Sequence, residues 1–347
     1  MPGVLDVALV GYGYAGRVLH APLIAHTPGL RLHTVVSSAP ERVRADHPQA
    51  RVVATPGDAF GDAGIDLVVV ATPNAAHAPL AIAALQAGRH VLVDKPMATT
   101  LDEARGMVAA ARGSGRVLSV FQNRRHDADF LALRQLLDDG QLGEVVELHS
   151  HFDRFRPQVP DRWRDRAGPG AGLWFDLGPH LVDQVLQLFG MPEMVQADIA
   201  AQRAGAVVDD FFHVVLRYPR LRAALHAGAL VPANGLRFAV HGTRGSFVKH
   251  GVDPQEATLR EGGVPGAPDW GRDPQPGVFT PAGTQGVGTT RPVEGPPGDY
   301  RAVYRAMRDA ILGPGPPPVG LEQALAVMQV LQAGAESAAS GRCVAPA

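Results

Sequence analysis

The sequence predicts a two-domain α/β protein. A doubly wound parallel sheet (residues 1–122) precedes an α+β domain with a large, mostly antiparallel open sheet (residues 123–347). Three observations lead to this prediction. Apolar runs alternate with helical patterns in the first part, the pattern changes near residue 122, and strand-like runs joined by short turns follow. A chain of 347 residues, 46% of them hydrophobic, is long enough to build two cores.

Six apolar runs predict the strands of the parallel sheet. They are Val4–Val10, Leu30–Val36, Val52–Val53, Ile65–Ala71, His90–Val93 and Val117–Phe121. Helical patterns at Ala78–Ala87 and Leu101–Ala111 separate the later runs, and Thr100 with Glu103 predicts a capping box for the second helix. Continuous apolar strands that alternate with helices indicate a parallel sheet covered on both faces.

The second domain is predicted to combine helices with antiparallel strands. The helices are expected at Phe130–Leu137, Pro179–Phe189, Tyr300–Ile311 and Leu321–Glu336, and the strands at Val146–Phe155, Met194–Gln202, Phe211–Tyr218, Leu221–Val231 and Leu236–Val248. Residues 252–298 are rich in glycine and proline, and we expect a long loop there.

The composition argues against several classes of protein. With 32 basic and 34 acidic residues, the net charge of −2 gives no support for a nucleic-acid or membrane surface. The single cysteine, Cys343, excludes an intrachain disulfide and fits a reducing, cytoplasmic location. Asp6 interrupts the first apolar run, which we interpret as a strand and not a signal peptide. No apolar stretch reaches the roughly 18 residues of a membrane span.

A glycine motif follows the first predicted strand. Gly11, Gly13 and Gly16 form G-x-G-x-x-G before a helical pattern, as in a Rossmann dinucleotide-binding domain. The glycines allow a tight turn and the close approach of a pyrophosphate to the helix N-terminus. The alternative is an accidental turn in a chain with 40 glycines.

The end of the second strand bears on the choice of nucleotide. An NAD-selective enzyme usually has Asp or Glu about 20 residues after the motif, to bind the ribose hydroxyls. This chain has Ser37 and Ser38 there, with Arg42 nearby, and these side chains can bind a 2′-phosphate. We therefore predict NADP, with NAD less favoured. The alternative is an ordinary loop with a solvated arginine.

Three further motifs carry a resemblance to a known family. They are Ala71-Thr72-Pro73-Asn74 followed by His77, Asp94-Lys95-Pro96, and Asp176-Leu-Gly-Pro-His180-Leu-Val-Asp183. In this order they resemble the Gfo/Idh/MocA oxidoreductases over essentially the whole chain. Further motifs, among them Leu230-Val-Pro-Ala-Asn-Gly235, are most similar to the NADP-dependent scyllo-inositol dehydrogenase branch. The chain departs from the family by having Asp94 where Glu is usual.

The resemblance implies site residues in both domains. Thr72, Asn74, His77 and Lys95 would bind the cofactor, and Asn123, Arg124 and Asp183 would contact the substrate. Trp163 could cap a sugar-like ring, with simple packing as the alternative.

The chemistry of alcohol oxidation supports roles for three residues. Removing a hydride from a carbinol requires a base for the hydroxyl proton. Pro179 is predicted in the first turn of its helix, so that the dipole keeps His180 neutral. Asp176 would orient this imidazole, and Lys95 would offset developing alkoxide charge. Lys95 and Lys249 are the only lysines, and chemistry can require a compact ammonium. The alternatives are a solvated helix face for His180 and a surface cation for Lys95.

The pattern does not predict a metal site. His149, His151 and Asp153 alternate on one strand face, but no complete ligand set accompanies them, so a solvated sheet surface is the preferred interpretation.

The predicted function is therefore hydride transfer between NADP(H) and a ring hydroxyl or ketone of a polyol such as an inositol. The alternatives are an aldose or other sugar dehydrogenase or reductase, and a non-catalytic NADP-binding sensor. The resemblance implies a homodimer or homotetramer, and the open face of a broad sheet, which has to be covered, agrees with this expectation.

Overall fold

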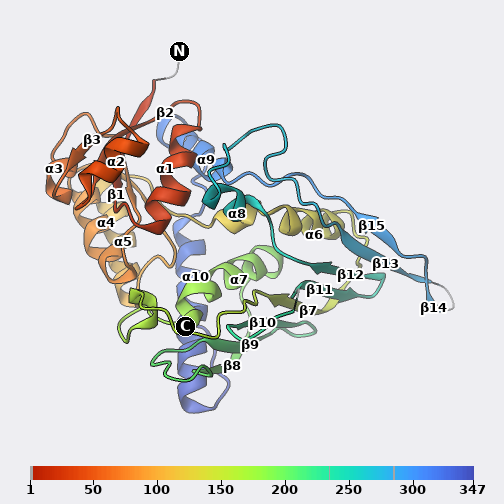
Figure 1. Cartoon of the computed structure of the whole chain (residues 1–347). Helices are drawn as coiled ribbons and strands as arrows, with labels where there is room; N and C mark the ends of the chain where they lie inside the picture. Colours follow the sequence, from red (N-terminus) through yellow and green to blue (C-terminus); the bar gives the residue numbers. More distant parts are fainter. Residues whose placement is uncertain (1–2, 234, 284–285) are drawn as a thin grey trace. The chain divides into compact units, whose positions relative to one another are not determined.

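The computed structural model describes residues 3–233, 235–283 and 286–347, which form two compact units (Figure 1). The first unit runs to Asn123 and also includes Gln255–Trp270 and Asp299–Leu325. The second contains Arg124–Pro254, Gly271–Gly298 and the chain from Ala326. Two later segments of the chain thus return to the first unit, which was not predicted from the sequence. None of the helices in the described ranges has the length and hydropathy that a transmembrane helix requires.

The first unit contains the predicted doubly wound parallel sheet. Its strands are β1 (Leu5–Val10), β2 (Leu30–Val36), β3 (Arg51–Val53), β4 (Leu67–Val70), β5 (His90–Val93) and β6 (Leu118–Val120), in the order β3-β2-β1-β4-β5-β6. All neighbouring pairs are parallel. The strand order reverses between β1 and β4, and ligands of such sheets bind outside the carboxyl ends at this point.

Short helices connect these strands. A π-helical segment (Ala15–His20) leads into α1 (Ala21–Ala25), and the others are α2 (Pro40–Asp46), α3 (Pro56–Phe60), α4 (His77–Gln86), α5 (Leu101–Ser114), α8 (Gln255–Arg260) and α9 (Arg301–Leu312). The predicted capping box of α5 is confirmed. Thr100 Oγ1 accepts from the Glu103 N–H at 3.2 Å, and the Glu103 carboxylate accepts from the Thr100 N–H at 3.3 Å.

The second unit contains the predicted large sheet, which is mostly antiparallel. Its strands are β7 (Val145–His151), β8 (Met194–Ala200), β9 (Phe211–Arg217), β10 (Arg222–Gly228), β11 (Leu236–Gly242), β12 (Gly245–His250), β13 (Gly277–Gly283), β14 (Gly286–Val287) and β15 (Arg291–Val293). The order is β14-β13-β12-β11-β7-β10-β9-β8, with β15 beside β13. Only β7 and β10 among these described pairs run parallel.

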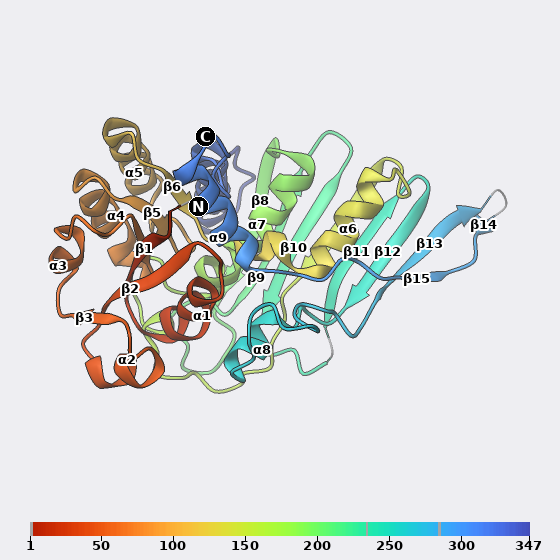
Figure 2. The ribbon, with the colours of Figure 1, turned by 90° about the horizontal axis from the view of Figure 1, so that it is seen from above.

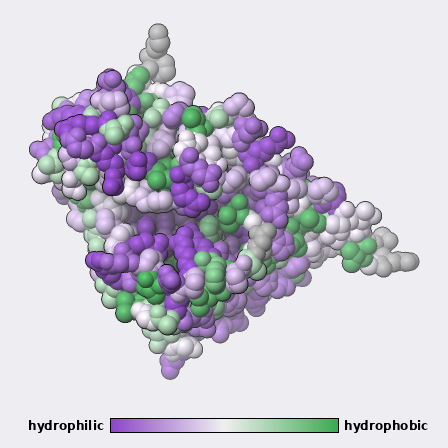
Figure 3. All heavy atoms as spheres, viewed as in Figure 1, coloured by the Kyte–Doolittle hydropathy of each residue, from purple (hydrophilic) through white to green (hydrophobic). Residues whose placement is uncertain are grey.

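Helices α6 (Ala128–Asp138) and α7 (Leu173–Phe189) lie on one face of this sheet (Figure 2). The core of the unit lies between them and the strands, where Leu148, Phe212 and Leu225 are fully buried. Trp174 of α7 is also buried, and its indole N–H donates to the Leu331 carbonyl of α10 (Leu321–Ser340) at 3.0 Å. The surface in Figure 3 is largely hydrophilic, with hydrophobic patches that include the tip formed by β13 and β14.

Helix α7 begins earlier than predicted, and this corrects one argument about the site. The helix starts at Leu173, so Pro179 lies inside it and not in its first turn. A proline there is tolerated partly because Gly178 precedes it, and glycine has no Cβ to clash with the ring. His180 is therefore beyond the first turn, where the helix dipole has little effect on its protonation.

Other predicted elements also differ in extent. The strand predicted at Leu236–Val248 is a hairpin, since the chain turns between Gly242 and Gly245 to form β11 and β12. The loop predicted at 252–298 contains α8 and the edge strands β13 to β15. The strand predicted to reach Phe155 ends at His151, and Phe155 makes only an isolated bridge to Leu230.

Candidate active site

The glycine motif forms the turn between β1 and the following helical segment. Gly11 has a φ of 98°, and a Cβ there would lie 2.6 Å from the Ala71 carbonyl oxygen. A Cβ on Gly16 would lie 2.0 Å from the Gly11 carbonyl oxygen. Gly13 differs, because a Cβ there would have no described atom within 4 Å. Packing thus explains two of the glycines, and the open space at Gly13 fits the approach of a pyrophosphate.

Thr72 lies beside this turn, just after β4. Its methyl carbon would lie 3.3 Å from a Cβ added to Gly11. The Thr72 hydroxyl is buried and has no hydrogen-bond partner among the residues that the structure describes. A buried polar atom of this kind usually has a partner, which a bound nucleotide would provide. The turn and this hydroxyl together fit a dinucleotide.

His77 and Asn74 follow Thr72 and are both buried. The two ring nitrogens of His77 face backbone carbonyls, with Nδ1 2.8 Å from the Pro96 oxygen and Nε2 3.0 Å from the Thr72 oxygen. Burial lowers the pKa of His77. The imidazole therefore connects the segments that follow β4 and β5, and it positions Thr72 and Pro96.

Ser37 and Ser38 lie between the end of β2 and the start of α2, and Arg42 lies in the first turn of α2. Ser37 Oγ accepts from the Ala39 N–H at 3.0 Å, while Ser38 and Arg42 are exposed.

A carboxylate that the sequence analysis did not consider lies at the end of α2. Asp46 accepts from the Tyr12 hydroxyl at 3.0 Å and from Arg17 Nε at 2.6 Å. The hydrogen bond from Arg17 lowers the pKa of Asp46. Asp46 is thus hydrogen-bonded to two side chains of the first unit.

Lys95 directly follows Asp94 at the carboxyl end of β5 and is 9% exposed. Its backbone N–H donates to Asp94 Oδ1 at 2.8 Å. Burial raises the pKa of Asp94, but the neighbouring His20 and Lys95 lower it more, to about 2. Asp94 is therefore a carboxylate at neutral pH and places a negative charge beside the lysine.

His20 is a buried neighbour of this pair that sequence reasoning missed. Its Nδ1 is 2.6 Å from the Tyr304 hydroxyl, and its Nε2 is 3.7 Å from Asp94 Oδ2, an ion-pair distance and not a hydrogen bond. Its ring packs on Phe121 with centroids 4.4 Å apart. His20 and Tyr304 are 284 residues apart in sequence, so no local pattern connects them.

Asp176 and His180 lie one turn apart on α7, in the second unit, and so share a helix face. Asp176 is in the first turn, and its carboxylate oxygens lie 3.5 Å from Arg164 Nε and 3.7 Å from Arg154 Nη1. His180 is 5% exposed. Asp176, Arg154 and Arg164 line one pocket of this unit, together with Arg203 and Asp210. A pocket lined by such donors and acceptors can bind hydroxyl groups.

Two predicted substrate residues are held in buried ion pairs. Arg125 donates to both carboxylate oxygens of Asp183, at 2.8 and 2.7 Å. Arg124 is 3.2 Å from Asp127 and lies over the Phe152 ring, 4.4 Å from its centroid. These contacts lie inside the second unit, and the substrate-binding roles of Asp183 and Arg124 stay predictions.

The remaining predicted residues are Asn123 in the first unit and Trp163 in the second. Asn123 is buried at the end of the first unit's main segment. Trp163 is half-buried in a short 3-10 helix, and the Arg164 guanidinium stacks 4.6 Å from its ring centroid. In the motif that ends at Gly235, Asn234 lies outside the described residues.

The comparisons with known proteins agree with this geometry. Residues 5–122 match the Gfo/Idh/MocA description "Oxidoreductase family, NAD-binding Rossmann fold", and residues 134–345 match "Oxidoreductase family, C-terminal alpha/beta domain". The uncharacterized oxidoreductase YdgJ of Escherichia coli is 51% identical over 335 residues, 96% of each chain.

Two further relatives extend over nearly the whole chain. The scyllo-inositol 2-dehydrogenase (NADP(+)) IolW of Bacillus subtilis is 38% identical over 98% of this chain and 95% of its own. The crystal structure of an oxidoreductase from Bacillus cereus is 32% identical, covers 98% of both chains and superposes with a TM-score of 0.90.

Proposed function

The chain belongs to the Gfo/Idh/MocA oxidoreductase family, and on this basis we propose that it transfers a hydride between NADP(H) and a ring hydroxyl or ketone of a cyclic polyol, of the scyllo-inositol type. The observation that carries the proposal is the placement of Lys95. A buried lysine follows β5, and the buried Thr72 hydroxyl and the glycine turn follow the neighbouring strands β4 and β1. The similarity to IolW supports the choice of substrate and cofactor.

The glycine turn, Thr72 and the segment around Ser37 would hold the nucleotide, whose nicotinamide would supply the acceptor for the hydride of the carbinol carbon. In the oxidative direction, His180 takes the hydroxyl proton on a ring nitrogen, and Asp176 orients the imidazole. The Lys95 ammonium stabilises the negative charge that develops on the substrate oxygen. Arg154 and Arg164 hold Asp176 and offer donors to further hydroxyls.

An assay with a panel of cyclic polyols and aldoses tests this proposal. With NADP and a cyclic polyol, the absorbance of the reduced nicotinamide should rise. A rise with aldoses alone would instead identify a sugar dehydrogenase. NADP binding without turnover of any member would favour the sensor function.

Cofactor selectivity is expected to depend on Arg42. NADP should bind several-fold more tightly than NAD, since a charge-assisted hydrogen bond to the 2′-phosphate is available only to NADP. Arg42→Ala should weaken NADP roughly tenfold and leave NAD unchanged. Arg44→Ala is the matched control, because Arg44 lies on the same helix and pairs with Glu41. Fluorescence titration with both nucleotides measures this, and equal affinities for the wild type would contradict it.

Self-association stays a prediction, as does the cytoplasmic location. The tip formed by β13 and β14 exposes apolar side chains, with Val278 40% and Val287 82% exposed, and such groups favour burial against a second copy. Light scattering at micromolar protein should give a dimer or tetramer, and a clean monomer would rule this out.

A further inference from the structure

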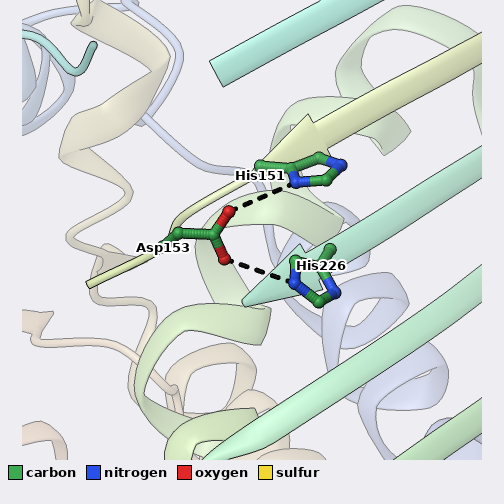
Figure 4. Close-up of side chains that lie close together, drawn as sticks. All are labelled: His151, Asp153 and His226. Carbon is green, nitrogen blue, oxygen red and sulfur yellow. Dashed lines mark hydrogen bonds and ion pairs between the residues drawn. The ribbon is translucent and has the colours of Figure 1, made fainter. Parts of the chain in front are cut away.

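Two histidines and an aspartate meet at the ends of β7 and β10 in the second unit. His151 is the last residue of β7, and His226 lies directly opposite it in the parallel register with β10. Asp153 follows two residues after His151. Figure 4 shows its carboxylate between the two imidazoles, in what we name the His–Asp–His cluster (His151, Asp153 and His226).

The ligand atoms of this cluster lie close enough together to bind one metal ion. His151 Nδ1 is 3.3 Å from Asp153 Oδ2, and His226 Nε2 is 3.3 Å from Asp153 Oδ1. One ligand atom from each residue lies within 4.8 Å of the other two. Zinc bonds to nitrogen and oxygen of about 2.0–2.2 Å place tetrahedral ligands roughly 3.3–3.6 Å apart.

A network of hydrogen bonds around Asp153 is the competing explanation for the cluster. His151 Nδ1 is hydrogen-bonded to Asp153 Oδ2, and His226 Nε2 lies at ion-pair distance from Asp153 Oδ1. Both contacts, at 3.3 Å, are longer than the 2.7–3.2 Å typical of N–H···O bonds, and this spacing leaves the same atoms able to share an ion.

The Asp153 carboxylate of the cluster is buried and hydrogen-bonded to the backbone, whereas the two imidazoles are partly exposed to solvent. The Asp153 side chain is 7% exposed, and its Oδ1 also accepts from the Gly228 N–H at 3.0 Å. Such a second interaction orients a metal ligand. His151 and His226 are 20% and 17% exposed, so an ion and a water molecule can reach them.

The donor atoms of the cluster determine which ions it would prefer. The set has two imidazoles and one carboxylate, and imidazole donors favour zinc and other late transition metals over magnesium or calcium. The His149 and His213 rings lie nearby, 6.1 Å from the His151 ring and 5.8 Å from the His226 ring, outside this set.

We propose that His151, Asp153 and His226 bind one divalent transition-metal ion, with Zn²⁺ as the expected ion. The ion would tie the end of β7 to β10, next to Phe152, Arg154 and Gly228, which line the pocket that contains Asp176. Its role is structural, and the hydride-transfer residues named above do not depend on it for chemistry.

Zinc titration of the full-length, untagged and chelator-treated protein tests the site. Calorimetry should show about one Zn²⁺ bound per chain at micromolar or lower concentration, and Co²⁺ should give the intense visible bands of a tetrahedral site. His226→Gln and Asp153→Asn should each weaken binding at least tenfold, by loss of a ligand. His250→Gln is the matched control, because His250 is exposed at the end of β12 and outside the cluster.

Zinc should also raise the melting temperature of the wild type and of His250→Gln but not that of His226→Gln. Failure of the wild type to bind stoichiometric zinc overturns the proposal. So does unchanged affinity in both cluster variants. If a variant does not fold, the wild-type isotherm and the Co²⁺ spectrum decide the matter alone.

Discussion

Lys95→Arg is expected to lower turnover about 10²–10⁴-fold, the range typical of a lost proton-transfer or charge-stabilising group. Arginine keeps the charge, but its guanidinium is planar, larger and unable to give up a proton in this pH range. Lys95 is 9% exposed beside Asp94, so the larger group cannot reach the same position without displacing its neighbours.

Turnover and NADP binding should both be measured for Lys95→Arg, beside a control variant. NADP should still bind, because the Gly11–Gly16 turn and the Ser37 segment are intact in the variant. Lys249→Arg is the matched control, since Lys249 is the other lysine and pairs with Asp273 at 3.1 Å in the second unit. Near-normal turnover in Lys95→Arg would show that the lysine is structural.

Arg125→Leu is expected to destabilise the protein by about 3–5 kcal/mol, because it leaves the Asp183 carboxylate buried without its partner. Both Asp183 oxygens accept from Arg125, and Asp183 is 2% exposed. Burial raises the pKa of Asp183, although Arg125 lowers it in part. Urea unfolding measures the loss of stability.

The loss of stability in Arg125→Leu should depend on pH, because the pKa of Asp183 is raised in the folded protein. A buried carboxylate with a raised pKa binds a proton more readily in the folded state than in the unfolded chain. The deficit in Arg125→Leu should therefore shrink as the pH falls through the folded-state pKa of Asp183.

Two variants control this experiment. Arg166→Met, which breaks the exposed pair with Asp161, should change stability by less than about 1 kcal/mol. A double variant with leucine at both 125 and 183 should recover much of the loss. A small stability change in Arg125→Leu, together with a raised KM, would return Asp183 to the substrate-binding role that the sequence suggested.

The parallel sheet could be predicted nearly residue by residue, because its strands are continuous apolar runs. The runs Leu30–Val36 and His90–Val93 are β2 and β5 in the structure. The second unit was harder to predict. Its Gly-Pro pair at 178–179 resembles a helix start but lies inside α7, and its edge strands β13 to β15 occur in a segment rich in glycine and proline.

Site residues that belong to short motifs could be predicted from the sequence. Their partners, which are distant in the sequence, could not. The glycine turn, Thr72 and Lys95 belong to short motifs that follow strands. His20 meets Tyr304, and His226 meets His151, only through the fold, across separations that leave no periodic signal. Asp183 was predicted as a substrate contact, and its ion-pair partner Arg125, 58 residues away, could not be predicted from the sequence.

Transfer of deuterium from a ring carbon of a cyclic polyol to NADP tests the proposed reaction most directly. With ring-deuterated scyllo-inositol or a related inositol, mass spectrometry should find the label in the reduced nucleotide and a ketone as the second product. Lys95→Arg should bind NADP and transfer almost no label. A wild-type protein that binds NADP and acquires label from no cyclic polyol would contradict the proposed function.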